Sequence, residues 1–231
     1  MVNRIHRNSG ARGVRGSCRR LVPGEKMTYA AGKKASAARP KKRESARERV
    51  LTASYELFRR QGTSSVGIDA VVKLSGVAKT SLYRHFHSKQ ELIAAFLERR
   101  EQLWTVDWLK SETCRRAMSP AVRLLAIFDV FNDWFQSEDF GGCSFINVLL
   151  EYPPGHPSRR QAGIHLSNIR AFLKTLATEA GINNPQTFAD VWHIMMKGAI
   201  VAACEGGRDA ARKAKVAARL YLDSCLTARS Q

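Results

Sequence analysis

Apolar residues recur at intervals of three and four along most of this chain, and that periodicity limits the possible fold more than any other feature. The first run begins at Val50 and stops at Gly62, and the second begins at Ile68 and stops at Gly76. No segment alternates apolar and polar residues as a half-buried strand does, and no Asn-Gly or Asp-Gly hairpin turn occurs. The sequence therefore predicts an all-α fold of about nine helices.

Caps and helix breakers mark the later helices. Ser88 followed by Glu91 has the spacing of a capping box and opens a long fourth helix. Pro120 at a first helical position opens a fifth helix, which Gly141-Gly142 ends. Four more helices are predicted over residues 143–152, 158–180, 185–204 and 208–228. The apolar side of the long fourth helix is expected to consist of Leu92, Ile93, Phe96, Leu97, Leu103, Trp104 and Trp108.

Positive charge is concentrated at the N-terminus. The chain has 38 Lys+Arg against 20 Asp+Glu, a net charge of +18, and residues 1–43 hold thirteen of the basic residues but only one acid, Glu25. These residues show no helical periodicity, so we expect a disordered basic arm, with Met27 as a candidate start of the protein. Such an arm either contacts a polyanion, for which a phosphate backbone, a membrane surface and an acidic partner are alternatives, or is simply solvated.

Several classes of function are disfavoured. The five cysteines are widely spaced without a Cys-x-x-Cys pair, which fits neither a disulfide framework nor a zinc site and suits a reducing cytoplasm. No P-loop, His-Glu-x-x-His or nucleophile elbow occurs, so we expect no catalytic residue and no cofactor. His85 and His87 would point apart on a helix end, so we expect no metal. The longest apolar stretch, 14 residues at 191–204, is shorter than the about 20 that span a bilayer, so a cytoplasmic protein without a membrane partner is expected.

Residues 45–86 have the pattern of a helix-turn-helix. Two short helices flank the Gly76 turn, and an amphipathic helix precedes them. Val77, Leu82 and Phe86 would anchor the second short helix. Its other side would then project polar residues that fit the major groove of DNA, where they reach base edges and phosphates. These residues are Lys79, Thr80, Ser81, Tyr83, Arg84 and His85.

The same residues closely resemble the DNA-binding domain of the TetR/AcrR family of transcriptional regulators. The run Leu-Tyr-Arg-His-Phe at 82–86, followed by Ser88-Lys-Gln-Glu-Leu92, carries most of the likeness, and the spacing matches without a gap from residue 50. The resemblance implies that Lys79, Thr80 and Ser81 face bases, that Tyr83 and His85 contact phosphate, and that Lys89 holds the backbone. Two departures are Val66-Gly67, where the family usually has Thr or Ser, and Ala78, where a capping Ser is frequent.

The resemblance extends, with less specific motifs, to about residue 226. It implies a DNA-binding domain at 44–90 and a helical domain at 91–231 that dimerises and senses an unidentified small molecule. We expect a repressor that binds a two-fold symmetric operator in double-stranded DNA as a homodimer and is released by its ligand. The resemblance implies that small residues along 191–202 and 210–225 form the dimer interface, and packing of these two helices within one chain is the alternative. A cavity between the helices that follow Pro120 is expected to be lined by Phe128, Phe131, Phe145, Asn147, His165, Ile169, Trp192 and His193.

Overall fold

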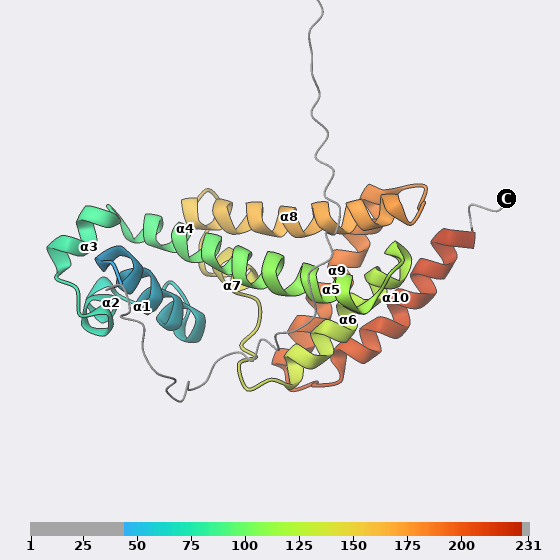
Figure 1. The fold of residues 1–231 in the computed structure, drawn as a ribbon, viewed down its shortest axis with the longest axis horizontal. Helices are drawn as coiled ribbons and strands as arrows, with labels where there is room; N and C mark the ends of the chain where they lie inside the picture. The colour runs from blue at the N-terminus through green and yellow to red at the C-terminus, as the bar shows by residue number, and fades with distance from the viewer. Residues whose placement is uncertain (1–43, 228–231) are drawn as a thin grey trace, which may run out of the picture. The chain divides into compact units, whose positions relative to one another are not determined.

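A computed structural model describes residues 44–227, and every regular element in that part of the chain is a helix (Figure 1). The basic arm and the candidate start at Met27 lie outside the described residues. The elements are α1 (Ala46–Gln61), α2 (Ile68–Ser75), α3 (Lys79–His85), α4 (Lys89–Arg100), η1 (Glu101–Lys110), α5 (Ser111–Arg116), α6 (Pro120–Gln136), α7 (Ser144–Glu151), α8 (Pro157–Glu179), α9 (Pro185–Cys204) and α10 (Ala210–Thr227). The all-α fold predicted from the periodicity is confirmed.

Helices begin where the sequence supplies a side-chain cap. The hydroxyl of Ser88 accepts a hydrogen bond from the Glu91 N–H, 3.2 Å away, as the capping-box spacing predicts. Glu91 itself accepts from the N–H of His87, at 2.7 Å, rather than from that of Ser88. The start of α6 at Pro120 is also confirmed, with the Ser119 hydroxyl capping the helix. These local contacts satisfy N–H groups that the helix itself leaves without partners.

The long fourth helix is continuous from α4 through η1 to α5, so the described residues contain about nine separate helical rods, as expected. Its middle third, η1, is a π-helix, which the apolar spacing does not indicate. The buried positions along this part of the rod, at a spacing of four to five residues, are Arg100 of α4, Trp104, Thr105 and Leu109 of η1, and Thr113 of α5. A wider turn moves side chains around the axis, so the prediction that Leu103 faces inward is wrong: it is 42% exposed.

Aromatic side chains join the helices into one core. Phe96 of α4 packs edge-on against Phe58 of α1, with ring centroids 5.5 Å apart. Trp104 of η1 packs similarly against Trp134 of α6, at 5.0 Å. In Figure 1, α8 lies beside α4, and α10 lies beside both α6 and α9. The long rod α4–η1–α5 therefore connects the first three helices, which we call the trihelix, to the remaining helices.

Candidate functional site

The turn between α2 and α3 depends on Gly76. Its φ of 62° and ψ of 24° place it in the left-handed region, which a glycine adopts without steric cost. The N–H of Gly76 donates to the Val72 carbonyl and ends α2. Beyond the turn, Val77, Leu82 and Phe86 are all buried, so they anchor α3 against α1 and α2 as the sequence predicts. The junction between α2 and α3 is therefore held by the turn at Gly76 and by these three buried side chains.

The opposite side of α3 is polar and open to solvent. Lys79, Thr80, Tyr83, Arg84 and His85 are exposed, and Ser81 is half-buried. Lys89 lies at the first position of α4 and is half-buried. Six candidate DNA-contacting residues are thus collected on one short helix, with the seventh at the beginning of the next.

Lys79 is paired within the chain, which the sequence does not reveal. Its Nζ lies 2.8 Å from Oδ1 of Asp69, in the first turn of α2. The hydrogen bond and the charge of Asp69 raise the pKa of Lys79. Both side chains are mostly exposed, so the pair contributes little to stability. Its consequence is electrostatic: an acidic group stands on the same surface as the cationic reading residues. The two positions are ten residues apart, and only the folded turn brings them together.

The two departures from the usual family pattern have the structural effect expected of them. Gly67 at the start of α2 and Ala78 at the start of α3 make no side-chain capping hydrogen bond. Relative to Ser or Thr, alanine at the cap costs α3 about 1 kcal/mol, whereas glycine at the cap costs α2 only a few tenths of that. Buried contacts of Val71 and Leu82 hold the two helices despite this loss.

A single carboxylate connects the trihelix to α7. Oε2 of Glu151, the last residue of α7, accepts from the N–H of Thr63 at 2.8 Å, the hydroxyl of Thr63 at 2.5 Å and the N–H of Ser64 at 2.8 Å. Gly62 has a φ of 81°, and a Cβ built there would lie 2.7 Å from Oε1 of Glu151. The positive φ favours glycine at this position, and any side chain here would push against the Glu151 carboxylate. We call this contact the Glu151 junction.

The Glu151 junction also touches one of the candidate DNA contacts. The Nζ of Lys89 donates to the Ser64 carbonyl at 3.2 Å, so the same loop is bonded by Glu151 and by Lys89. Burial lowers the pKa of Lys89, and the negative charge of Glu151 opposes that shift. A second link is formed by Arg59 of α1, whose Nη1 donates to the Asp139 carbonyl at 3.3 Å and pairs with its carboxylate.

The interior behind the trihelix is filled largely by aromatic side chains, and the ligand-sized cavity expected there stays a prediction. Phe131, Ile169 and His193 line a void of about 10 Å³, enough for no more than one water molecule. Phe128, Phe145 and Trp192 are fully buried in contacts with other side chains, and they do not line it. The bends at Pro120 and Gly141-Gly142 do separate the helices, but large aromatic side chains fill the space between them.

The other two candidate lining residues lie elsewhere. His165 is buried against Phe145, and its Nδ1 lies 2.7 Å from Oε2 of Glu101 at the start of η1. Asn168 donates to the other oxygen of that carboxylate at 2.8 Å. Asn147 is exposed on α7, so its side chain contributes nothing to the wall of the void.

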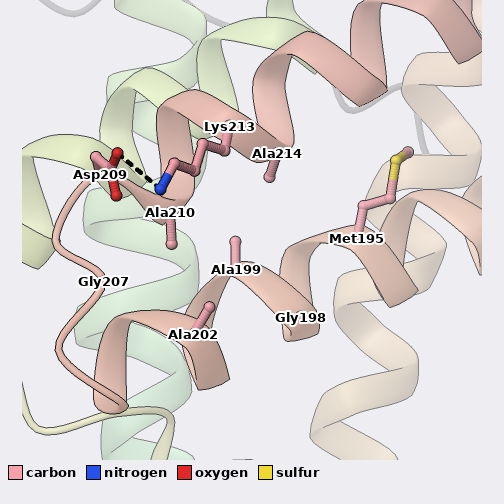
Figure 2. Close-up of a pocket in the computed structure, with 9 residues that line it drawn as sticks. All are labelled: Met195, Gly198, Ala199, Ala202, Gly207, Asp209, Ala210, Lys213 and Ala214. Carbon is pink, nitrogen blue, oxygen red and sulfur yellow. Dashed lines mark ion pairs between the residues drawn. The ribbon is translucent and has the colours of Figure 1, made fainter.

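A larger hollow of about 300 Å³ lies between α9 and α10 (Figure 2). In Figure 2, Ala199 and Ala202 on α9 face Ala210 and Ala214 on α10, and the Lys213–Asp209 ion pair, 3.0 Å long, closes one end. Its lining is mostly small and apolar, which agrees with the small-residue pattern of these two helices in the sequence.

Comparison with known proteins agrees with this geometry. Residues 50–96 match the family model for bacterial regulatory proteins of the tetR family. The structure resembles that of a Streptomyces avermitilis protein assigned to the TetR regulators, with 30% identity, a TM-score of 0.70 and coverage of 79% of this chain and 98% of that one. A TetR-family regulator of Streptomyces coelicolor, SCO4454, is 24% identical with a TM-score of 0.71, covering 78% of this chain and 90% of its own. The chain belongs to the TetR family of transcriptional regulators.

Relatives of named function match over shorter stretches. The transcriptional activator FasR of Mycolicibacterium smegmatis is 34% identical over 98 residues, which are 41% of this chain and 42% of FasR. The regulator QacR of Staphylococcus aureus is 32% identical over 66 residues, which are 29% of this chain and 35% of QacR. The chain thus matches less than half the length of either protein. Both are regulators rather than enzymes by name. Within residues 44–227, no helix is long and apolar enough to cross a membrane.

Proposed function

We propose that this chain is a sequence-specific transcriptional regulator that binds double-stranded DNA with α3. The observation that carries the proposal is the polar, exposed side of α3 opposite three buried anchors, set at a fixed angle by Gly76. A rigid short helix with polar side chains near its N-terminus is the shape that enters a major groove. Lys79, Thr80 and Ser81 would then reach base edges, while Tyr83, Arg84, His85 and Lys89 would contact the backbone.

Selected binding sites test this assignment. Tyr83→Phe and Lys89→Met should weaken binding to all DNA sequences by a similar factor, because phosphate contacts carry no sequence information. Lys79→Met and Thr80→Val should instead change which bases are enriched. Sequencing the DNA fragments retained by each purified variant distinguishes the two effects. An unchanged base preference in all four variants would contradict the role of α3 as the reading helix.

The proposed operator is two-fold symmetric because the proposed DNA-binding unit is a homodimer. The outward sides of α9 and α10 carry exposed apolar residues: Ile194 and Val201 on α9, and Val216 and Leu220 on α10, each between 49% and 69% exposed. They lie on the same two helices as the residues that line the hollow of Figure 2. A second copy of the same surface would remove these side chains from water and bring two α3 helices into one complex.

Oligomeric state tests the dimer. Leu220→Glu would place two like charges in a symmetric interface, and it should yield monomers in analytical ultracentrifugation. Lys174→Glu, an exposed change on α8, is the matched control and should remain dimeric. A dimeric Leu220→Glu variant would place the interface elsewhere.

We further propose that the dimer is a repressor released from its operator by a small molecule. The Glu151 junction supports a coupled response, because a shift of α7 would move the loop that precedes α2. The name of FasR, an activator, makes activation the competing outcome. Transcription from a promoter carrying the selected operator, with and without the protein, decides the direction: repression lowers the transcript, and activation raises it.

A further inference from the structure

The ion pair between Lys79 and Asp69 joins the two short helices on either side of the Gly76 turn. Asp69 is the second residue of α2, and Lys79 is the first residue of α3. Nζ of Lys79 lies 2.8 Å from Oδ1 of Asp69, and the two side chains are 53% and 83% exposed. The exposed surface therefore presents a hydrogen-bond donor and a hydrogen-bond acceptor side by side, on helices that the turn and the buried side chains of α3 hold in place.

The pair stands next to the residues that would read DNA. The hydrogen bond to Asp69 and its charge raise the pKa of Lys79, and Tyr83, one turn further along α3, adds to that shift. Asp69 thus belongs to the surface that α3 would bring to the major groove. An ion pair between exposed side chains contributes little free energy, so contact with bases can rearrange it at small cost.

A carboxylate on a surface that faces DNA acts selectively. Phosphates and the acceptor atoms of the bases repel it, so it lowers the affinity for most sequences. That loss is offset only where a base donates a hydrogen bond to the carboxylate. In the major groove, the donors are the N4 amino group of cytosine and the N6 amino group of adenine. Asp69 therefore disfavours every sequence that places no amino group opposite it, and such a repulsive element produces specificity.

The neighbouring lysine distinguishes between these two amino groups. Guanine offers an ammonium two adjacent acceptors, O6 and N7, whereas adenine offers N7 beside an amino group that repels a positive charge. The cytosine paired with that guanine presents its N4 amino group next to guanine O6. One G·C pair thus supplies the acceptors that Lys79 needs and the donor that Asp69 needs.

We propose that Asp69 is a base-reading residue on α2, and that Asp69 and Lys79 together read one G·C base pair in each half of the operator. The ammonium of Lys79 donates to O6 and N7 of guanine, and the carboxylate of Asp69 accepts from the groove-facing N4–H of cytosine. This inference rests on the proposed function, because it requires α3 to lie in the major groove. It adds a reading residue outside α3 and names the base pair that is read.

Site selection with the full chain first locates the base pair. It is the position at which Lys79→Met relaxes the base preference, and the wild type should select G·C there. Two modified duplexes then remove one groove atom each. In N4-methylcytosine a methyl group replaces the amino hydrogen that points into the major groove, and 7-deazaguanine lacks N7. By fluorescence anisotropy, each modification should weaken binding of the wild type about fivefold.

Variants assign each loss to one side chain. Asp69→Leu keeps a branched side chain of similar size without its oxygens, so it should bind cytosine and N4-methylcytosine duplexes equally and remain sensitive to 7-deazaguanine. Lys79→Met should show the reverse pattern. Glu138→Gln, which removes one negative charge elsewhere on the surface, is the control and should respond to both modifications as the wild type does.

The outcomes separate this inference from the proposed function. A base pair other than G·C at the selected position would overturn the reading by the pair. Equal losses with N4-methylcytosine in the wild type and Asp69→Leu would show a steric effect of the methyl group, and no loss in the wild type would show no contact. Either result overturns the role of Asp69 and leaves α3 as the reading helix. A wild type that selects no sequence at all would instead contradict the proposed function.

Discussion

Removing the charge at residue 151 should loosen the trihelix from the helices behind it. In Glu151→Gln the side-chain length is kept, but the oxygen that accepts from Thr63 and Ser64 becomes a neutral amide oxygen. Three hydrogen bonds converge on Oε2, at 2.5–2.8 Å. A hydrogen bond to a charged group contributes about 1.5–3 kcal/mol and a neutral one about 0.5–1.5 kcal/mol, so each is weakened by up to about 1 kcal/mol. Discounting for partial exposure, we expect the free energy of unfolding to fall by about 2 kcal/mol.

Thermal denaturation followed by circular dichroism measures this effect. For a folded region of this size, about 2 kcal/mol lowers the melting temperature by roughly 4–8 °C. Glu138→Gln provides the matched control, since Glu138 is exposed between α6 and α7 and should melt as the wild type does. A double-mutant cycle with Thr63→Val should show coupling, because Glu151→Gln weakens the same hydrogen bond that Thr63→Val removes. Equal melting temperatures for the two glutamine variants, or additive losses of stability in the cycle, would refute a stabilising role for the Glu151 junction.

Three further outcomes follow from charge. Asp69→Asn should tighten non-specific DNA binding, because it removes the acid that pairs with Lys79 on the exposed side of α3. Fluorescence anisotropy with random duplexes measures the affinity, and an unchanged affinity would contradict the proposal that this side of α3 faces DNA. Deleting residues 1–42 should reduce the slope of log affinity against log salt by about 0.9 for each phosphate that the arm neutralises, and identical slopes would mean that the arm leaves DNA untouched. The folded pKa of His193, about 3, lies below the ordinary histidine value of 6.5, so the unfolded chain binds an extra proton between these pH values. Stability should therefore fall as the pH drops from 6.5 towards 3, and His193→Gln should flatten that decline in denaturant titrations.

The parts of the fold that depend on local chemistry were predictable from the sequence. Gly76 has the left-handed backbone that its position between two short apolar runs indicates, and Ser88 and Pro120 begin helices as their capping signals predict. The π-helix η1 was not predictable in the same way. Its apolar residues fit a period of 3.6 closely enough that Leu103 looks internal. The contacts of η1 with α6 and α8, through Trp104 and Glu101, join residues far apart in the sequence and are not visible in that spacing.

Contacts between residues far apart in the sequence were also not predictable, because they depend on how the helices pack. Glu151 and Thr63 are 88 positions apart, and neither is unusual in type for the end of a helix or for a loop. Gly62 alone carried a signal, because it ends α1, but its second role at the Glu151 junction requires knowing where α7 lies. The sequence thus locates the residues proposed to face DNA, and the folded structure adds those that hold them in place.

The interior shows why helix breakers are a poor guide to cavities. Pro120 and Gly141-Gly142 bend the chain where expected, and divergence of the helices alone would leave space between them. The same region is rich in aromatic residues, and Phe131, Trp134 and Phe135 fill that space with edge-to-face and tilted contacts at 5.6–5.7 Å.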